Sequence, residues 1–212
     1  MCYMEVVPPL RPLPRSFYLR PAAEVARDLL GCWLVRDLPG ERLIVRLLET
    51  EAYLGARDRA SHAWAGRRTA RNAALYLAGG HAYVYFIYGM HFCLNVVTGE
   101  FGEGEAVLLR AAEPVRGAAR MATYRGLDGS PRKSRELLSG PGRLCQALRI
   151  DRDLDGIRLA RGSLWLARGE LIGEEEVACG PRVGIAYAGE AVRWPLRFAI
   201  SGHSGVSRPR LP

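Results

Sequence analysis

Lysine is almost absent from this sequence. Lys133 is the only one, so 29 of the 30 lysine and arginine residues are arginines. Lys133 lies in a polar stretch far from the aromatic residues discussed below, which leaves a Schiff-base mechanism without an obvious amine. The planar fork of arginine binds phosphate groups better than the point charge of lysine does. With a formal charge of +8, the composition favours a polyanionic partner, although a genomic bias toward arginine explains the same excess equally well.

Paired cysteines are also absent. The five cysteines form no C-x-x-C motif and are odd in number, which argues against a disulfide framework and against a structural zinc site. Cys32, Cys93 and Cys145 lie among apolar neighbours, so we expect them in the core. His91 and Cys93 are two possible metal ligands without partners, which is a weak signal for a metal site.

The chain lacks any apolar run of membrane length and any N-terminal signal pattern. We therefore expect no membrane association and a location in the reducing cytoplasm. Several enzyme signatures are missing as well: G-x-S-x-G, H-E-x-x-H and the dinucleotide-binding fingerprint. These absences exclude the serine hydrolases, zinc peptidases and dehydrogenases that carry them.

The hydrophobic content of 49% over 212 residues is enough for one well-packed core. Predicted helices and strands are mixed without a βαβ rhythm, which favours the α+β class. We predict a single domain over residues 16–212, with a curved, mostly antiparallel sheet, surrounding helices and a protruding β-hairpin. Residues 1–15 contain four prolines and are predicted to form an irregular N-terminal arm.

Periodicity and turn residues give the expected elements. Helices are predicted over 22–29, 72–77, 114–124 and 139–148. Hairpins are predicted over 32–53 and 82–97, and single strands over 106–111, 164–167, 182–185 and 196–200. The second hairpin has its tip at 88–91.

Two carboxylates lie close together in the first predicted hairpin. In a regular strand, Glu49, Glu51 and Tyr53 point to one face, with the carboxyl-bearing residues about 7 Å apart. Such a pair can serve as acid and base, or as one base and one structural partner. The alternative is that both make surface ion pairs with arginines. Tyr53, followed by His62 after a short loop, favours a pocket that binds a planar ring.

The second hairpin is rich in aromatic residues. Tyr83 and Tyr85 share one face, and Tyr85 is a candidate stacking wall. Tyr88 lies at the predicted tip, where it can act as a wedge in a base stack or fold back into the core. Asn95 follows in an apolar strand and should be buried, either shaping the pocket floor or bonding to the backbone.

Arginines surround these elements. Arg110 ends an apolar strand, where it either fixes a carboxylate and a water molecule or extends to the surface. Arg67, Thr69, Arg71 and Asn72 have the character of phosphate contacts, with a solvated loop as the alternative.

Taken in order, these motifs resemble those of the alkyladenine (3-methyladenine) DNA glycosylase family. The resemblance covers about residues 20–207. The motifs that carry it are Glu49-Thr50-Glu51-Ala52-Tyr53, Ala60-Ser61-His62, Thr69-Ala70-Arg71-Asn72, Tyr83-Val84-Tyr85, Ile87-Tyr88-Gly89-Met90, Leu108-Leu109-Arg110-Ala111, Ser139-Gly140-Pro141 and Arg182-Val183-Gly184-Ile185.

The resemblance implies a monofunctional glycosylase that removes alkylated purines from duplex DNA, with deaminated and etheno purines as further candidates. It implies that Glu51 activates the attacking water and that Arg110 and the backbone of Val206 hold it. The remaining implied roles are base-pocket walls for Tyr53, His62 and Tyr85, screening of guanine-type amino groups for Asn95, and replacement of the flipped nucleotide for Tyr88.

The resemblance also implies a monomer that contacts the DNA backbone, and it implies neither a metal nor an organic cofactor. The residues predicted for this contact are Arg67, Thr69, Arg71, Gly89 and Met90. The chain departs from the family at Ala70, where proline is frequent, and at 202–205, where a proline and an aromatic usually precede Val-Ser. A damage-binding protein without activity and an RNA-binding or RNA-modifying domain remain as alternative functions. We expect Glu51 to be ionised beside Arg110.

Overall fold

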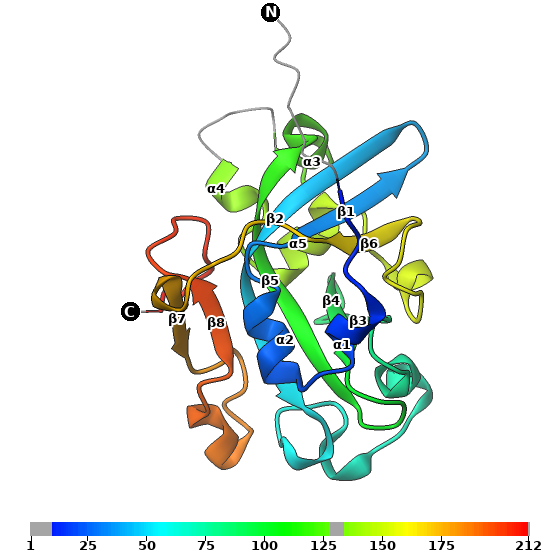
Figure 1. The fold of residues 1–212 in the computed structure, drawn as a ribbon, viewed down its shortest axis with the longest axis vertical. Helices are drawn as coiled ribbons and strands as arrows, with labels where there is room; N and C mark the ends of the chain where they lie inside the picture. The colour runs from blue at the N-terminus through cyan, green and yellow to red at the C-terminus, as the bar shows by residue number, and fades with distance from the viewer. Residues whose placement is uncertain (1–9, 128–133, 212) are drawn as a thin grey trace, which may run out of the picture.

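The computed structural model describes residues 10–127 and 134–211, which form an eight-stranded, curved antiparallel sheet with short helices packed around it (Figure 1). Six strands follow the order β3-β4-β5-β2-β1-β6, while β8 pairs with β2 and β7 pairs with β8. Every strand pair is antiparallel. The predicted α+β class with a mostly antiparallel sheet is therefore confirmed.

The strands are β1 (Trp33–Leu38), β2 (Glu41–Leu54), β3 (Ala82–Ile87), β4 (His91–Thr98), β5 (Glu105–Arg116), β6 (Leu164–Ala167), β7 (Val177–Gly180) and β8 (Arg197–Ile200). The α-helices are α1 (Arg15–Tyr18), α2 (Ala22–Asp28), α3 (Ala118–Tyr124), α4 (Ser134–Leu137) and α5 (Pro141–Ala147). The 3-10 helices are η1 (Gly55–Arg57), η2 (Trp64–Gly66), η3 (Ala70–Tyr76), η5 (Arg152–Leu154), η6 (Glu174–Glu176) and η7 (Gly189–Arg193).

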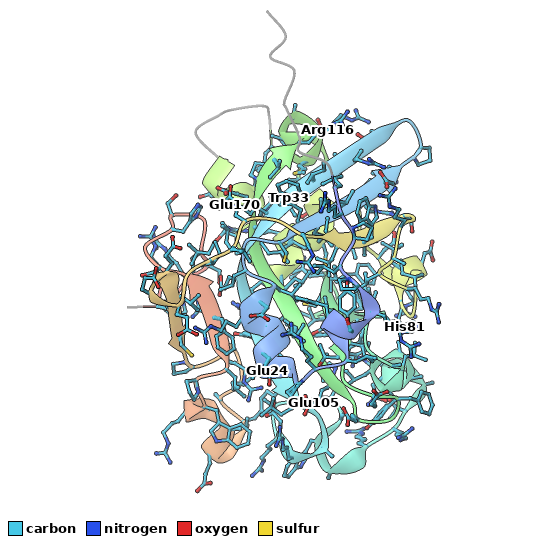
Figure 2. The ribbon with its side chains drawn as sticks, in the orientation of Figure 1. Glu24, Trp33, His81, Glu105, Arg116 and Glu170 are labelled. Atoms are coloured by element: carbon cyan, nitrogen blue, oxygen red, sulfur yellow. The ribbon has the colours of Figure 1, made fainter. Side chains whose placement is uncertain are left out.

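Helix α2 packs against one face of the sheet, and its sequence explains how. Pro21 precedes its first residue, and Ala22, Val25 and Ala26 form a buried stripe facing the sheet. Figure 2 shows Glu105 of β5 below the start of the helix, where its Oε2 accepts the backbone N–H of Ala22 at 2.9 Å. This carboxylate satisfies one of the free donors at the helix N-terminus.

Strand β2 changes partner along its length, and this change builds the site. Residues 41–46 pair with β1, whereas Glu49–Glu51 pair with β8. The register between β2 and β5 shifts on both sides of Glu49, which marks an irregularity that bends the strand. As a result, Glu49 and Glu51 lie between β5 and β8, where side chains from both neighbouring strands can reach them.

Two predicted elements are wrong. Residues 182–185 form a loop, because Arg182 is buried against Asp58, the Val183 N–H donates to a carboxylate, and Gly184 has a φ of +77°. The helix predicted from residue 114 begins at Ala118, because β5 continues pairing with β2 as far as Arg116.

Cys32, Cys93 and Cys145 are buried, as expected. In the predicted arm, residues 1–9 lie outside the described residues, while Leu13 donates its N–H to Leu166 O of β6 at 3.0 Å. Lys133 also lies outside the described residues. Among the helices that the structure describes, none is both long and apolar enough to cross a bilayer.

Candidate active site

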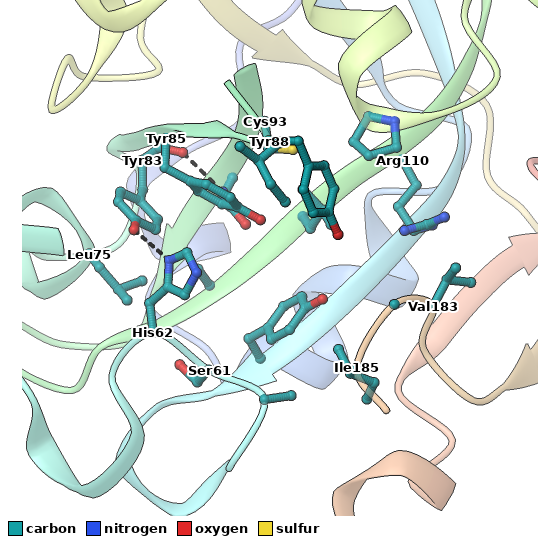
Figure 3. A pocket seen from close by; sticks show the side chains of 18 of the residues that line it. Ser61, His62, Leu75, Tyr83, Tyr85, Tyr88, Cys93, Arg110, Val183 and Ile185 are labelled. Carbon is teal, nitrogen blue, oxygen red and sulfur yellow. Dashed lines mark hydrogen bonds between the residues drawn. The ribbon is translucent and has the colours of Figure 1, made fainter. Parts of the chain in front are cut away.

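A cavity of about 300 Å³ opens between the β3–β4 hairpin, the end of β2 and the loop at 183–187. Its walls include most of the predicted pocket residues: Tyr53, His62, Tyr85, Tyr88, Asn95 and Arg110. Figure 3 shows His62 and Tyr83 on one side of this cavity and Arg110 and Val183 on the other. The structure thus brings the predicted pocket residues together, although two of them, Tyr53 and Arg110, are 57 positions apart in the sequence.

Aromatic rings line one side of the cavity. The His62 and Tyr85 ring centroids are 4.6 Å apart at an interplanar angle of 67°, and the Tyr83 and Tyr85 centroids are 5.4 Å apart. His62 Nδ1 and the Tyr83 hydroxyl are 2.7 Å apart, within hydrogen-bonding distance. Desolvation lowers the pKa of His62, and the nearby Arg71 and Arg67 lower it further, so the ring favours its neutral form.

Asn95 combines the two alternatives that the sequence left open. It is buried, lines the cavity, and donates from Nδ2 to the backbone oxygen of Tyr83 at 3.1 Å. This bond fixes the amide group against β3, where Tyr83 is its register partner.

Glu51 lies fully buried at the floor, behind the cavity-lining residues Tyr53 and Val183. Its Oε2 accepts the Tyr53 hydroxyl at 2.9 Å, and its Oε1 accepts the Val183 N–H at 2.7 Å. Arg110 Nη1 is 3.3 Å from Oε1. The carboxylate is therefore held by groups from β2, β5 and the loop after β7.

Glu49 forms the second half of this floor. Its Oε1 accepts Nε of Arg110 at 2.8 Å and Nε of Arg197 at 2.7 Å. Ser207 donates its backbone N–H to Oε2 at 2.7 Å and its hydroxyl to Oε1 at 2.9 Å. Both glutamates are fully buried and Arg110 is also buried, so the alternatives of surface ion pairs and of a surface-exposed Arg110 are wrong.

The two carboxylates have opposite pKa shifts. Burial raises the pKa of Glu51 above its ordinary value, against the lowering effects of Arg110, Val183 N–H and Tyr53. Burial also acts on Glu49, but the guanidinium groups of Arg110 and Arg197 and the Ser207 N–H together hold the pKa of Glu49 below its ordinary value. Burial thus favours proton uptake by Glu51, whereas its arginine partners favour the ionised form of Glu49.

A second buried ion pair supports the wall opposite the aromatic cluster. Arg182 Nη2 donates to Asp58 Oδ1 at 2.9 Å, and Nη1 donates to Asp58 Oδ2 and to Ala52 O. The Arg182 guanidinium carbon lies 4.7 Å from the Tyr53 ring centroid. This pair therefore fixes both the Tyr53 ring and the loop that delivers the Val183 N–H to Glu51.

The hairpin tip stands in solvent. Tyr88 is 79% exposed and Met90 is 70% exposed, so the alternative in which Tyr88 folds into the core is wrong. Tyr88 and Gly89 both have positive φ, 53° and 66°, a region that bulky residues rarely occupy. Such local strain concentrates at functional sites, and here it presents an aromatic ring at the cavity mouth.

A second cleft of about 310 Å³ adjoins the cavity and shares Ser61, His62, Tyr83 and Tyr187 with it. Arg67, Thr69 and Arg71 line this cleft, and no carboxylate does so among the described residues. Asn72 also lines this cleft. It is buried, and its side-chain nitrogen donates to His62 O and Arg67 O, so it shapes the loop instead of presenting its amide outward.

Val206 lies outside the cavity lining, and its side chain packs with Leu30, Leu48, Ala199 and Ile200. Its neighbour Ser207 bonds to both Glu49 and Arg110, which places the Val206 backbone beside the charged floor. Within residues 10–127 and 134–211, no group of three His, Cys, Asp or Glu side chains could hold a metal ion. Burial raises the pKa of the pocket thiol Cys93 to about 11, so it is not a nucleophile at neutral pH.

Sequence reasoning missed several residues of the site. Asp58 and Arg197 carry no local signal, because their partners lie more than 120 positions away in sequence. Tyr187 lines the cavity mouth from a loop of no regular structure. Tyr83 shares the face of Tyr85, and this period-two spacing could have added it to the predicted pocket.

Comparison with known proteins gives a consistent family. The model of the methylpurine-DNA glycosylase family matches residues 16–204. A putative 3-methyladenine DNA glycosylase of Methanocella arvoryzae is 50% identical, with 92% of this chain and 96% of the relative covered. One from Carboxydothermus hydrogenoformans is 47% identical, with coverage of 92% and 98%. The human DNA-3-methyladenine glycosylase is 46% identical, with coverage of 91% and 66%.

Proposed function

Because this chain belongs to the methylpurine-DNA glycosylase family and is a DNA N-glycosylase, we propose that it excises alkylated purines from duplex DNA by nucleotide flipping and water attack. The proposed place of this reaction is base excision repair. Family membership also selects the glycosylase over a non-catalytic damage-binding protein and over an RNA-binding domain.

The observation that carries the mechanism is a buried carboxylate beneath an aromatic cavity. Glu51 is the proposed general base, and its raised pKa makes it a stronger acceptor for a water proton. Arg110 keeps its Nε 2.8 Å from Glu49 but its Nη1 3.3 Å from Glu51. This looser contact leaves Nη1 able to share a water molecule with Glu51, and the Val206 carbonyl is the proposed third partner of that water.

A base inside a duplex cannot reach this floor, so the nucleotide must first rotate out. The exposed Tyr88 is proposed to fill the space left in the stack, which offsets part of the unstacking cost. Tyr53, His62 and Tyr85 are the proposed walls for the extruded ring. An alkylated purine with positive charge gains cation–π attraction from such walls.

A positively charged purine is already a good leaving group, so one base suffices for its removal. Neutral deaminated and etheno purines need a proton donor, and they are proposed only as further substrates. Asn95, fixed against β3, is the proposed screen against guanine-type amino groups.

Contacts outside the cavity are proposed to hold the DNA backbone. Arg67, Thr69 and Arg71 line the neighbouring cleft, and Gly89 and Met90 follow Tyr88 at the hairpin tip. Arginine contacts to phosphates make binding fall steeply with salt concentration. We further propose that the protein acts as a monomer inside the cell, without a membrane partner.

The test uses duplexes that carry one 3-methyladenine-type, hypoxanthine or etheno-adenine lesion, followed by hot alkali. Strand breaks that appear only after alkali are expected, because a monofunctional enzyme removes the base and leaves the backbone intact. Glu51→Gln is expected to lose excision while lesion-DNA binding stays. Retained excision by this variant contradicts the role of Glu51, and tight binding without excision by the wild type contradicts the proposed substrates.

A further inference from the structure

Glu49 is a buried charged group, next to the proposed base, that the proposed mechanism does not use. Four hydrogen bonds converge on its carboxylate, from Arg110 Nε, Arg197 Nε, the Ser207 N–H and the Ser207 hydroxyl. A carboxylate that is fully buried costs several kcal/mol of desolvation unless it is well paired. Because this carboxylate lies in the floor next to Glu51, it can do more than stabilise the fold.

The three guanidinium nitrogens of Arg110 have separate partners. Nε donates to Glu49, Nη2 donates to the Ser207 hydroxyl at 3.1 Å, and Nη1 is the nitrogen nearest Glu51. Glu49 and Ser207 therefore hold one edge of the guanidinium plane. Since that plane is rigid, they also fix where Nη1 stands relative to the proposed base.

The same carboxylate orients the peptide group that joins Val206 to Ser207. The Ser207 N–H donates to Glu49 Oε2 at 2.7 Å. In a trans peptide the carbonyl of the preceding residue points opposite to this N–H, so the Val206 carbonyl is directed away from Glu49. Arg197 secures the segment further, because its Nη2 donates to Ser207 O at 3.1 Å.

We propose that Glu49 is a positioning residue that sets, from one carboxylate, both protein groups that hold the attacking water: Arg110 and the Val206 carbonyl. This inference rests on the proposed function of Glu51. Glu49 contacts neither the base nor the water, and acts through Arg110 and Ser207. When the charge of Glu49 is removed, Arg110 is free to turn and to pair with Glu51 through two nitrogens. This pairing blocks the proposed base and fills the site proposed for the attacking water.

The charges around Glu49 give this role a distinctive readout. Arg110 from β5 and Arg197 from β8 face it, and Glu51 is the neighbouring anion on β2. The negative charge of Glu49 acts to raise the pKa of Glu51, and Arg110 acts to lower it. Glu49→Gln removes the first influence and strengthens the second, so the pKa of Glu51 falls and the acidic limb of the pH–rate profile moves to lower pH.

The experiment measures single-turnover excision of a cationic methylated purine from a duplex, with enzyme in excess, as a function of pH. For Glu49→Gln we expect a plateau rate about 100-fold lower, the cost of misplacing reacting groups by about 1 Å. We also expect an acidic limb at lower pH and lesion-DNA affinity close to that of the wild type. Thr50→Val is the matched control, because Thr50 is buried in the same strand but bonds to Ala26 O of α2 instead.

Two outcomes overturn the inference. One is a Glu49→Gln enzyme with the plateau and limb of the wild type. The other is a Glu49→Gln enzyme whose excision rate falls only in proportion to its folded fraction, with the acidic limb of the pH–rate profile unchanged, as is expected for Thr50→Val. If Glu49→Gln does not fold, Glu49→Asp decides, because it keeps the buried charge but withdraws the carboxylate by one methylene from Arg110 and from the Ser207 N–H. A slower plateau in a stably folded Glu49→Asp supports the inference, and a wild-type plateau overturns it.

Glu51→Gln and the wild type are measured in parallel to separate this inference from the proposed function. An inactive wild type, or an active Glu51→Gln, shows that the proposed function fails. An active wild type with an inactive Glu51→Gln and an unaffected Glu49→Gln shows that only the role of Glu49 fails.

Discussion

On the floor of the cavity every carboxylate oxygen of Glu49 and Glu51 accepts a hydrogen bond from the protein, whereas at its mouth Tyr88 and Met90 expose most of their surface. The floor is formed by strands and closed by charges that are far apart in sequence. The mouth is the turn of one hairpin, whose backbone bond joins Met90 N–H to Ile87 O.

This difference fits two separate tasks. Groups that act on the reacting bond gain most when their positions are fixed before the substrate arrives. Groups that open the duplex must find a partner in the DNA, so they remain exposed until it binds. Substitutions on the floor should therefore lower the stability of the fold or the rate of base excision. Substitutions at the mouth should affect only the steps that involve DNA.

The largest expected effect comes from Asp58→Asn, which breaks the buried ion pair that fixes Tyr53 and the loop delivering the Val183 N–H to the floor. This change leaves the buried Arg182 charge without its carboxylate, which typically costs about 3–5 kcal/mol. Urea unfolding followed by circular dichroism measures the loss. Asp28→Asn is the control, because Asp28 pairs with Arg20 at the surface and should lose at most about 1 kcal/mol. Equal stability of the two variants contradicts the role of the Arg182–Asp58 pair as a buried support next to the floor.

The mouth should respond to Tyr88→Ala with no loss of stability. Aromatic stacking on a base is worth about 1–3 kcal/mol by alanine substitution, so excision from duplex DNA should slow by about 5- to 150-fold. A single-stranded substrate should lose much less, because no stack has to be opened. Phe101→Ala is the control, since Phe101 is 72% exposed but does not line the cavity. Equal losses on single and double strands would falsify the wedge role.

Lowering the pH should reduce the excision rate before it unfolds the protein, because the two glutamates of the floor have opposite pKa shifts. Glu51 must be ionised to act, and its pKa is raised above 4.5, so the excision rate should fall about tenfold per pH unit below that raised pKa. The stability contributed by Glu49, whose folded pKa lies below its ordinary 4.5, is present above pH 4.5 and is lost only as pH falls through that lowered pKa. The pKa of Glu51 is raised in the folded protein, so the folded state binds its proton more tightly than the unfolded chain does, and Glu51 contributes more to stability as pH falls.

The measurement compares the single-turnover rate with near-ultraviolet circular dichroism as the pH is lowered from neutrality through and below the ordinary glutamate value of 4.5, because one shift lies above that value and the other below it. Activity should decline first, with the spectrum intact. Simultaneous loss of both signals contradicts the assignment of different roles to the two carboxylates.

The sequence could predict the mouth better than the floor. Hairpin spacing and β-forming residues locate the strands around Tyr88, and the alternation of Tyr83 and Tyr85 follows from the pleat. The floor depends on where β8 joins β2, and no local pattern specifies that pairing. Glu49 and Arg197 are 148 positions apart, so their contact follows from topology alone.

The strand predicted at 182–185 shows the same limit. Its alternating apolar residues suit a strand, but the backbone bonds to a carboxylate and Arg182 closes a buried pair. The resemblance to a known family supplied Glu51, Arg110 and Tyr88 as site residues, which spacing alone had left open among several alternatives.

The smallest expected effect concerns the cationic cleft beside the mouth. Arg67 lines it without a carboxylate partner among the described residues, so Arg67→Ala should leave stability unchanged. Loss of one phosphate contact should weaken DNA binding by a similar factor for damaged and undamaged duplexes, and should reduce the slope of log affinity against log salt by about 1. Arg168→Ala is the matched control, because Arg168 is exposed and follows β6, at the opposite edge of the sheet from β3. An unchanged slope for Arg67→Ala contradicts a phosphate contact. If Arg67→Ala weakens binding only to damaged duplexes, Arg67 contacts the lesion and not the DNA backbone, and it then belongs to the lesion pocket.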